Sequence, residues 1–371
     1  MIRAELLSIG AELLLGETVD TNAAFLGREM ATLGLPLAGV RMLPDDRAVL
    51  RDAFTEARGR SSVVLATGGL GPTHDDLSRE GLADAMHEDL AEDPALVEAL
   101  EARFGGAERM PATNRRQAAR VPSAEALPNP IGSAPGWWVD RDDVVVALMP
   151  GVPSEMRRMW AEQVRPRLAV RFPLPPLATR TVKAFGIGES AMAERLGALL
   201  TDPPAGVDVG IYARDDGVHV RFSSRGEAVE LEQLVDGALA SLGDDAYGTD
   251  EEELATAALA RLGALGAETL TSWEGDTAGS LIAILAAAPE RDGAARYVGG
   301  VLDAGTPIGP PPGDVTLQLS LLPQDAHGRS RVRIALSGAV ALPVTERRIH
   351  GSGPQRLRRA AFAALDVVRR L

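Results

Sequence analysis

Residues 66–80 read ATGGLGPTHDDLSRE, and the apolar, β-branched run SVVL at 62–65 comes directly before them. An apolar run followed by glycines and then by polar residues is typical of a strand, a loop and a helix. Glycines in such a loop let bare backbone N–H groups approach an anion. The stretch indicates either a phosphate-binding loop with a metal-binding acid pair, or a polar loop without chemistry.

The same alternation of strand and helix runs through roughly the first 170 residues. Strand candidates at 4–9, 35–40, 62–67 and 143–148 alternate with helix candidates at 22–33, 49–58, 77–86 and 153–168. Asp20 or Thr21 is expected to cap the 22–33 helix, and Gly34 to end it. The pattern predicts an α/β fold with a doubly wound, mostly parallel sheet.

Two changes of composition divide the remaining chain. Prolines at 166, 173, 175 and 176 predict a linker, and an acidic run at 244–253 marks a second boundary. Between them, a helix follows the GIGES stretch at 186–190, and strands are expected at 207–212 and 218–223. The part after 250 is rich in Ala, Leu and Gly, with a loose stretch at 305–314 and a final helix at 355–371. The predicted domains are 1–171, a small α+β domain at 172–250, and an α/β domain at 251–371.

Composition restricts the chemistry. The chain of 371 residues has no cysteine, five histidines, one lysine (Lys183) and a net charge of −14. Disulfides, thiolate catalysis and Cys-based zinc sites are excluded, and a P-loop lacks its lysine. Nucleic-acid binding by a broad basic surface is disfavoured. Any metal should be a hard cation held by carboxylates and phosphate oxygens. Without a signal-peptide layout or a membrane-spanning run, a cytoplasmic protein is expected.

Three polar loops share one layout. The stretches 8–22, 67–76 and 149–156 each follow a strand candidate and precede a helix. In a parallel sheet such loops emerge at the carboxyl edge, where ligands bind. The glycines are expected to offer N–H groups, and the hydroxyls to donate to phosphate oxygens. The acids cap helices, bind a divalent cation or act on a water. The glycines are Gly68, Gly69 and Gly71. The hydroxyl groups belong to Thr67, Thr73 and Ser154, and the acids are Asp75, Asp76 and Glu155.

Simpler interpretations exist for several residues. Asp75, Asp76 and Glu155 stand at helix starts, where acids commonly act as caps. Glu12, Glu17 and Asp20 are equally suited to be solvated loop acids, and His74 is not expected to be a base. Trp137 and Trp138 are expected to pack in the core or at a sheet edge. The conjunction of three polar loops favours a functional site.

Over nearly its whole length the chain resembles the CinA family of competence/damage-inducible proteins. The matching stretches are AELLSIGAELLLGETVDTNAAFLGREMATLG, ATGGLGPTHDDLSRE, NRRQAARVP, LPNPIGSAPGWWV, LMPGVPSEMRRMW and GIGES. The resemblance implies a molybdopterin-binding-like first domain with ADP-ribose pyrophosphatase activity, dependent on Mg²⁺, Mn²⁺ or Co²⁺. It also implies a small KH-like connecting domain, a deamidase-like last domain and a homodimer.

The resemblance carries over to individual positions. It implies Asp75 and Asp76 as metal ligands, and these two with Glu155 as catalytic residues. Other matching positions in the loops are implied to line the pocket, as is Pro153. The full set of predicted substrate-binding residues is Gly10, Glu12, Asn22, Thr67, Gly68, Gly69, Gly71, Thr73, Gly132, Ser133, Gly136, Gly151 and Ser154.

The last domain departs from the family pattern. Family versions resemble nicotinamide-mononucleotide deamidase, with a serine nucleophile in a Thr-Ala-Glu-Ser-Cys-Thr-Gly-Gly pattern. Here TSWEGDTAGS keeps Glu274 and Thr277, but Gly275 stands at the serine position and Asp276 at the cysteine position. Downstream, Gly299 and Gly300 remain, a helical stretch is replaced by PPPGD, and a Gly-rich loop is reduced to SLLP at 320–323. Covalent hydrolysis needs a nucleophile, so deamidase activity is expected to be absent.

The leading hypothesis is therefore metal-dependent hydrolysis of ADP-ribose to AMP and ribose 5-phosphate. One alternative is an enzyme that binds or adenylylates molybdopterin. Another is a non-catalytic, nucleotide-sensing scaffold linked to competence or DNA damage. The charge of −14 argues against direct contact with nucleic acid, and no membrane partner is expected.

Overall fold

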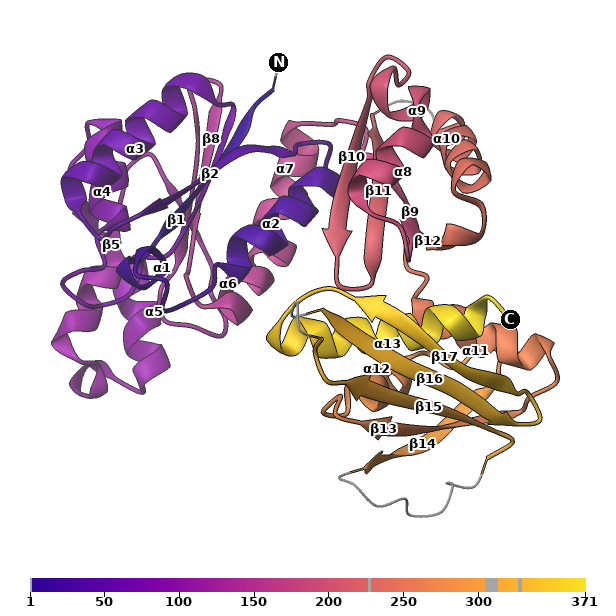
Figure 1. Cartoon of the computed structure of the whole chain (residues 1–371). Coiled ribbons are helices and arrows are strands. Elements are labelled where there is room, and N and C mark those ends of the chain that lie inside the picture. The colour runs from indigo at the N-terminus through magenta and orange to yellow at the C-terminus, as the bar shows by residue number, and fades with distance from the viewer. Residues whose placement is uncertain (1, 226–227, 304–312, 326–328) are drawn as a thin grey trace. The chain divides into compact units, whose positions relative to one another are not determined.

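The computed structural model describes residues 2–225, 228–303, 313–325 and 329–371. The chain forms two compact units, Met1–Leu177 and Ala178–Leu371 (Figure 1). The predicted loose stretch at 305–314 falls largely on residues 304–312, which lie outside the described residues. The predicted division into three domains stays a prediction.

The first unit is built on one six-stranded sheet with the order β2-β1-β3-β8-β7-β6. The first four strands in this order are parallel, and the last two are antiparallel. The strands are β1 (Ala4–Ile9), β2 (Leu37–Leu43), β3 (Val63–Thr67), β6 (Glu125–Leu127), β7 (Gly136–Arg141) and β8 (Val144–Met149). The predicted α/β fold with a mostly parallel sheet is confirmed.

Helices cover both faces of this sheet because successive strand residues point to opposite sides. Leu7 and Val64 pack beneath α3 and α4, whereas Leu6 and Val63 pack beneath α2, α6 and α7 (Figure 1). The helices are α1 (Ala11–Leu14), α2 (Thr21–Thr32), α3 (Arg47–Arg60), α4 (Ser78–Met86), α5 (Pro94–Phe104), α6 (Pro153–Met159) and α7 (Arg165–Arg171). Short elements are η1 (Ala107–Arg109), η2 (Ala112–Ala118), β4 (Ala91–Glu92) and β5 (Ala119–Arg120).

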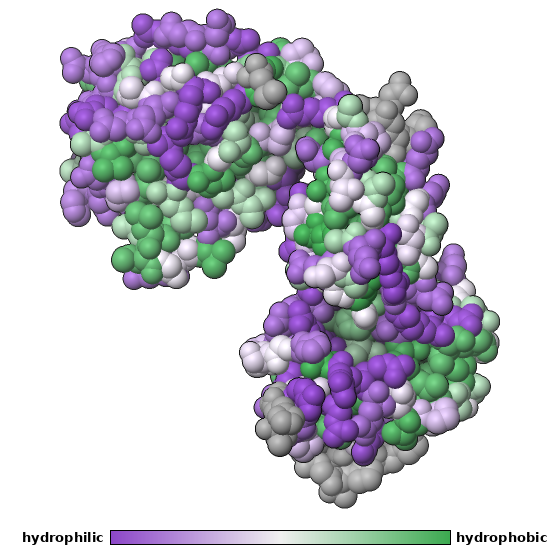
Figure 2. Space-filling model, turned by 45° about the horizontal axis from the view of Figure 1, so that its top comes forward, coloured by the Kyte–Doolittle hydropathy of each residue, from purple (hydrophilic) through white to green (hydrophobic). Residues whose placement is uncertain are grey.

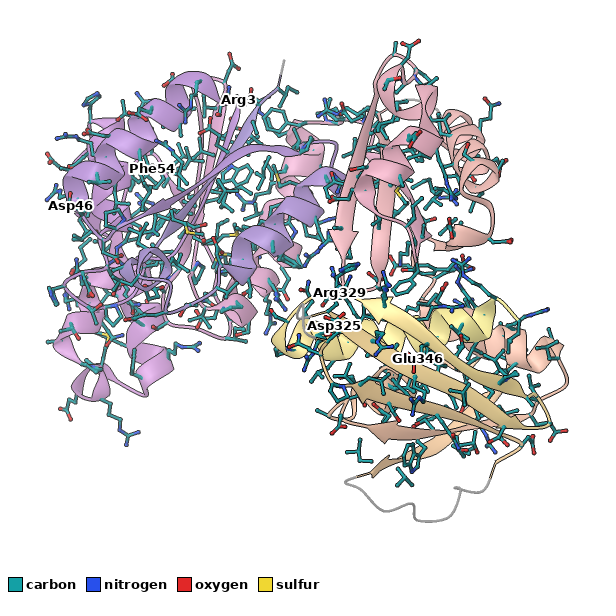
Figure 3. The ribbon with its side chains drawn as sticks, in the orientation of Figure 1. Arg3, Asp46, Phe54, Asp325, Arg329 and Glu346 are labelled. Carbon is teal, nitrogen blue, oxygen red and sulfur yellow. The ribbon has the colours of Figure 1, made fainter. Side chains whose placement is uncertain are left out.

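Helix α3 illustrates how sequence positions its ends and its buried face. Asp46 accepts hydrogen bonds from the backbone N–H groups of Ala48 and Val49, at 2.9 and 3.0 Å, and so caps the helix. Two turns on, Phe54 is fully buried against the sheet, whereas Asp46 stays at the surface (Figure 3). Asp20 caps α2 in the same way, as expected, through Ala23 N–H at 2.8 Å.

Two local predictions need correction. The second strand begins and ends later than the predicted 35–40. Pro166 is not part of a linker but lies in α7, which continues α6 through a π-helical turn, η3 (Trp160–Val164). Proline donates no N–H to a helical ladder, and Pro166 comes directly after the π-helical turn, where the regular α-helical hydrogen-bond pattern is already interrupted. Trp137 and Trp138 lie on β7 and are buried, as expected.

The second unit contains an antiparallel sheet with the order β10-β11-β9-β12. Its elements are β9 (Ala178–Ala184), α8 (Glu189–Leu196), α9 (Ala198–Thr201), β10 (Val207–Arg214), β11 (Gly217–Ser224), α10 (Ala228–Leu242), η4 (Gly243–Asp245) and β12 (Ala246–Thr249). Lys183, on the inner strand β9, donates a hydrogen bond from Nζ to the carbonyl of Glu252 at 2.9 Å. The strand β9 was not predicted, because no apolar alternation marks ATRTVKA.

A partly buried polar cluster joins this sheet's β10–β11 turn to β12. Tyr247 donates its hydroxyl to Asp216 at 2.8 Å, and His219 Nε2 lies 3.1 Å from the other oxygen of Asp216. Burial favours the neutral acid, but the hydrogen bonds from His219 and Tyr247 outweigh it and lower the pKa of Asp216 to about 2. The carboxylate of Asp216 is therefore ionised at neutral pH.

The rest of the second unit is a five-stranded sheet with the order β14-β13-β15-β16-β17 and three helices. Its elements are α11 (Leu254–Ala264), β13 (Thr269–Gly275), α12 (Ser280–Ala287), β14 (Arg296–Asp303), β15 (Val315–Leu322), β16 (Ser330–Gly338), β17 (Leu342–Ile349) and α13 (Gly353–Arg369). The last helix corresponds to the predicted 355–371. Leu270, Leu317 and Ile334 bury the sheet against α11 and α13.

The surface is mixed in character. Figure 2 shows hydrophilic residues over much of the visible face of each unit, interrupted by hydrophobic patches. Within the described residues, every helix is too short or too polar to cross a lipid bilayer.

Candidate functional site

The three polar loops meet at the carboxyl edge of the first sheet. Ser8, Thr67 and Met149 are register partners on the adjacent strands β1, β3 and β8, so the loops leave the sheet at one level. Gly68 has φ of +101°, and a Cβ there would lie 2.0 Å from the Ile9 carbonyl oxygen. A Cβ on Gly151 would lie 3.3 Å from the Gly68 Cα. Glycine is therefore required at 68, and a side chain at 151 would fit only tightly. The predicted convergence of the loops is confirmed.

Asn22 ties the first loop to the third. Its Nδ2 donates to the Gly151 carbonyl at 2.7 Å, although the two residues are 129 positions apart. Asn22 Oδ1 and Ser8 Oγ are buried and have no hydrogen-bond partner within the described part of the chain. Buried polar atoms without partners cost free energy, so these two atoms offer hydrogen-bonding capacity to a ligand or to water.

Asp76 closes the Gly-rich loop on itself. Its carboxylate accepts hydrogen bonds from Gly71 N–H at 2.7 Å, from Thr73 N–H at 2.8 Å, and from the Thr73 hydroxyl. Gly68 N–H donates to the Met149 carbonyl at 3.1 Å. The expectation that all three glycines offer N–H groups to phosphate is therefore corrected. Those of Gly68 and Gly71 hold the loop, and among them only Gly69 N–H meets no acceptor in the described residues.

Asp75 is exposed, whereas Asp76 is half-buried. The side chain of Asp75 is 60% exposed, and that of His74 is 99% exposed. Hydrogen bonding by Thr73 lowers the pKa of Asp75, which keeps this carboxylate ionised. Although adjacent in sequence, the two aspartates occupy different environments: Asp76 is engaged with the loop and Asp75 faces solvent.

A fourth strand contributes an acid that the sequence analysis missed. Asp45 follows β2 and accepts a hydrogen bond from Ala11 N–H at 2.9 Å. Burial raises the pKa of Asp45, and the nearby carboxylates of Glu12, Asp75 and Asp76 raise it further. Negative charge therefore accumulates at this end of the sheet. Asp45 could have been found from its position directly after a parallel strand. It was missed because that strand was predicted to end at residue 40, whereas it ends at Leu43.

Buried polar side chains at the start of α4 bind the backbone carbonyls of the Gly-rich loop. Ser78 Oγ donates to the Gly68 carbonyl at 2.8 Å. Arg79 is fully buried, and its two Nη atoms lie 3.3 Å from the carbonyls of Leu70 and Gly71. Burial lowers the pKa of Arg79. None of these roles was predicted.

Two side chains of helix η2 also bind backbone carbonyls of the same loop. Arg116 donates to the carbonyls of Thr73 and Asp76 and forms an ion pair with Glu80 at 2.8 Å. Gln117 Nε2 donates to the Leu70 carbonyl at 3.3 Å. Both residues belong to the stretch NRRQAARVP, which carried the family resemblance without an assigned role. The loop is held by side chains from two directions.

The third loop is organised around Glu155. Asn129 Nδ2 donates to Glu155 Oε2 at 2.7 Å, and Gly132 N–H donates to Asn129 Oδ1 at 2.9 Å. A Cβ on Gly132 would lie 1.9 Å from Glu155 Oε2, so glycine is needed where this acid packs. The structure thus brings Gly132 and Glu155 together, while Ser154 is exposed and Ser133 is half-buried.

Two other predicted glycines have steric roles. A Cβ on Gly136 would lie 2.3 Å from Met159 Sδ, and one on Gly10 would lie 2.5 Å from a carboxylate oxygen of Glu12. Gly136 therefore serves packing between β7 and α6, and Gly10 lets Glu12 fold back over the backbone of the first loop.

The motif in the second unit keeps its framework. Glu274 is buried and accepts hydrogen bonds from Thr277 Oγ1 at 2.5 Å, Leu281 N–H at 3.0 Å and Ile282 N–H at 2.6 Å. It therefore caps α12. Beside it, Gly275 ends β13, and a Cβ there would lie 3.4 Å from Ser320 Oγ. The interpretation of 320–323 as a reduced loop is corrected, because residues through Leu322 belong to β15.

Comparison with known proteins gives matches to two family models. A family model described as a probable molybdopterin binding domain matches residues 5–170. A second model, described as the damage-inducible protein CinA KH domain, matches residues 179–248.

Relatives of known name match across these regions and beyond. A CinA-like protein of Thermomicrobium roseum is 44% identical over 292 residues, which cover 77% of this chain and 71% of that protein. A CinA-like protein of Deinococcus radiodurans is 41% identical, covering 78% of this chain and 72% of that protein. The crystal structure of CinA from Thermoplasma acidophilum is 32% identical, with a TM-score of 0.43, covering 44% of this chain and 96% of that chain. With this identity over most of the chain and over more than two thirds of its relatives, the chain belongs to the CinA-like protein family.

Proposed function

We propose that this protein hydrolyses the diphosphate of ADP-ribose, giving AMP and ribose 5-phosphate, in a reaction that depends on a divalent cation. The observation that carries the proposal is the meeting of four strand ends at one edge. There, Ser8 at the end of β1 and Asn22 at the start of α2 carry buried polar atoms without a partner in the described residues, and the acids Glu12, Asp45 and Asp75 stand in the connections that follow β1, β2 and β3. Parallel sheets of this kind bind ligands at that edge.

The loops provide the contacts for a diphosphate. Gly69 N–H and the hydroxyl of Thr67 donate to phosphate oxygens, since both are held at the loop's start. Asn22 and Ser8 offer further polar atoms. Asp76 acts by keeping the loop in shape, through its hydrogen bonds to Gly71 and Thr73.

The acids fit a hard cation. Carboxylates are the oxygen ligands that Mg²⁺ and Mn²⁺ take, and Mg²⁺ is commonly held by one or two carboxylates together with substrate phosphates. In the described part of the chain no three acids or histidines are grouped closely enough to hold an ion by themselves. Asp75, with help from Asp45 or Glu12, would hold the cation jointly with the substrate. When bound, the cation neutralises phosphate charge and lowers the pKa of a coordinated water.

Glu155 is proposed to orient the attacking water. Its carboxylate is fixed by Asn129 at 2.7 Å, so it can accept a proton from water in a defined direction. Held this way, it acts from the third loop while Asp75 acts from the second.

The test is metal-dependent AMP formation from ADP-ribose. Asp75→Asn is expected to lower the rate by roughly a hundredfold or more, as for loss of a catalytic group. Glu98→Gln, which changes an exposed acid on α5 of the same unit, serves as the matched control. A rate unchanged by Asp75→Asn contradicts the role of this acid, and absence of AMP with every divalent cation contradicts the function.

A second candidate is binding or adenylylation of molybdopterin, favoured by the description of the family model that matches residues 5–170. Saturable pterin binding by a protein that leaves ADP-ribose intact supports it. ADP-ribose binding without turnover supports instead a nucleotide-sensing scaffold. We also propose that the chain lacks nicotinamide-mononucleotide deamidase activity, because Gly275 offers no nucleophile. A homodimer is a further proposal.

A further inference from the structure

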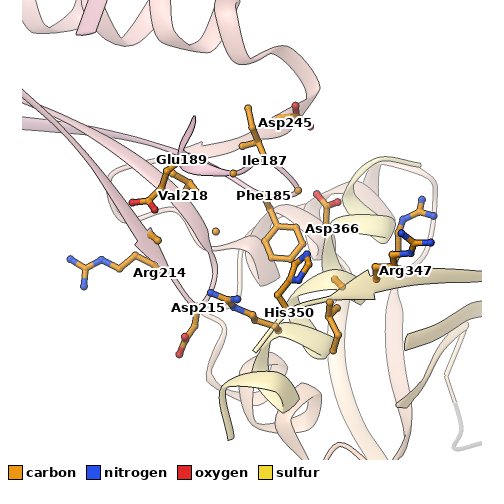
Figure 4. A pocket seen from close by; sticks show the side chains of 18 of the residues that line it. Phe185, Ile187, Glu189, Arg214, Asp215, Val218, Asp245, Arg347, His350 and Asp366 are labelled. Atoms are coloured by element: carbon orange, nitrogen blue, oxygen red, sulfur yellow. The ribbon is translucent and has the colours of Figure 1, made fainter. Parts of the chain in front are cut away.

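A pocket of about 640 Å³ lies in the second unit, away from the motifs discussed so far. It forms where the loop after β9, the β10–β11 turn, the end of β17 and one side of α13 meet (Figure 4). Its volume falls within the range of small-molecule sites, about 300 to 1,000 Å³. Gly186 and Gly188 of the GIGES stretch line this pocket. The proposed hydrolase activity assigns no role to this stretch.

Two groups of charges in the lining are already neutralised. Arg370 is paired with Asp245 at 2.9 Å and with Asp366 at 2.9 Å. Asp245 also pairs with Arg195 at 2.6 Å, and Asp366 with Arg369 at 2.7 Å. Asp215 lies 3.6 Å from Arg358 and accepts a hydrogen bond from Gln355 at 3.2 Å. These pairs build the walls and leave no free charge for a ligand.

Four other arginines line the pocket without a carboxylate partner in the described part of the chain. They are Arg214, Arg347, Arg348 and Arg359. Arg347 donates only to neutral groups, the Thr345 hydroxyl and the Glu346 carbonyl. Among the lining acids, Glu189 alone meets no cation in the described residues. Four unpaired guanidinium groups against one carboxylate leave an excess of three positive charges.

This excess is unusual in its setting, because the whole chain has a net charge of −14. Elsewhere many of its arginines form ion pairs, such as Arg331 and Arg333 with Glu346 on the neighbouring strands. Guanidinium groups gathered in a concave site are well suited to phosphate, which they bind through paired N–H donors. The charge therefore indicates an anionic ligand.

The remaining lining is apolar and partly aromatic. Phe185, Ile187 and Val218 contribute to it, and Ile349 is buried at its edge. In Figure 4, Phe185 and His350 lie between Arg214 on one side and Arg347 on the other. Rings offer stacking surfaces to a planar, uncharged group, and Arg214 and Arg347 lie on either side of them.

We propose that this pocket binds a nucleoside phosphate, with the base against Phe185 and the phosphate among the arginines. Single-stranded nucleic acid is the less favoured occupant. The arginines come from three separate elements, β10, β17 and α13, around a half-open pocket, rather than from one stripe that tracks a backbone, and the acidic chain repels long polyanions.

The experiment is hydrogen–deuterium exchange of the full chain with AMP, with inorganic phosphate, and with a single-stranded oligonucleotide. AMP is expected to protect peptides that contain residues 185–190 and 347–359. Protection there is read separately from any at residues 66–80, so failure of the proposed hydrolase site leaves this result unaffected. Inorganic phosphate is expected to protect the arginine segment more weakly, because it lacks a base.

The double variant Arg348→Ala/Arg359→Ala is expected to weaken AMP binding at this pocket roughly tenfold or more, since each charged hydrogen bond is lost. Arg225→Ala, an exposed arginine of the same unit outside the lining, is the matched control and is expected to leave the affinity unchanged. An unchanged melting temperature shows that the double variant is folded. The proposal is overturned by absence of AMP protection, by protection that persists in the double variant, or by protection from the oligonucleotide alone.

Discussion

Removal of its charge is expected to affect stability at Asp76 but not at Asp75. Asp76→Asn keeps one acceptor oxygen but turns an NH₂ group toward a donor, either the N–H of Gly71 or that of Thr73, which now lie 2.7 and 2.8 Å from the carboxylate. A hydrogen bond to a charged group contributes about 1.5–3 kcal/mol, and an unmatched donor adds a penalty. The free energy of unfolding of the first unit is therefore expected to fall by about 2–4 kcal/mol. Asp75→Asn, at an exposed side chain, is expected to leave it unchanged.

Urea unfolding followed by tryptophan fluorescence measures this difference. Three of the four tryptophans, at 137, 138 and 160, lie in the first unit, so the signal reports mainly on it. The midpoint for Asp76→Asn is expected to fall while the slope with urea stays the same, because the surface exposed on unfolding is unchanged.

Activity completes the comparison. Asp75→Asn is expected to lose AMP formation at full stability, whereas Asp76→Asn loses activity together with stability. The reasoning is refuted if Asp76→Asn unfolds at the wild-type urea concentration, because its carboxylate would then not be holding the loop.

Three further predictions follow from local geometry. The folded-state pKa of Asp216, about 2 against an ordinary 3.8, means that its charge stabilises the fold above about pH 4 and that this contribution is lost as the pH falls toward 2. Asp216→Asn is thus expected to cost on the order of 2 kcal/mol at pH 6 and much less at pH 2.5, as measured by urea unfolding with circular dichroism; an equal cost at both pH values speaks against it. Gly68→Ala is expected to cost about 2 kcal/mol or more, because its Cβ meets the Ile9 carbonyl at 2.0 Å, whereas Gly39→Ala, with no atom within 4 Å, serves as the control. Thermal melting that ranks the two alike contradicts this. Incubation with nicotinamide mononucleotide is expected to release no ammonia, since Gly275 stands at the nucleophile position; ammonia release that disappears when residues after 253 are deleted overturns it.

The meeting of the polar loops is predictable from the sequence because it depends on topology. Parallel strands recognised from apolar runs leave their carboxyl ends at one edge, whatever the details of the loops. Asp45 was missed because the end of the second strand was predicted wrongly. That strand was placed at 35–40, whereas it runs through Leu43. Its loop was therefore not compared with the other three.

The roles of side chains within the loops depend on three-dimensional detail that no spacing reveals. The pair DD suits a metal site and a loop closure equally well. That Asp76 closes the loop depends on where the N–H groups of Gly71 and Thr73 lie in three dimensions, which the sequence does not show. Arg79 follows a helix start, where an arginine is usually exposed. Its burial arises because the carbonyls of Leu70 and Gly71 turn inward and need donors.

Lys183 gives the chain a built-in probe of local opening. It is the sole lysine, and it lies on the inner strand β9, paired in register with His219 on one side and Gly248 on the other. An endoprotease specific for lysine can therefore cut the native sequence at one bond, which is protected as long as β9 stays in its sheet. Cleavage requires that strand to detach, so its rate measures the opening free energy of this sheet. Each molecule yields two fragments, 1–183 and 184–371, without any engineered site.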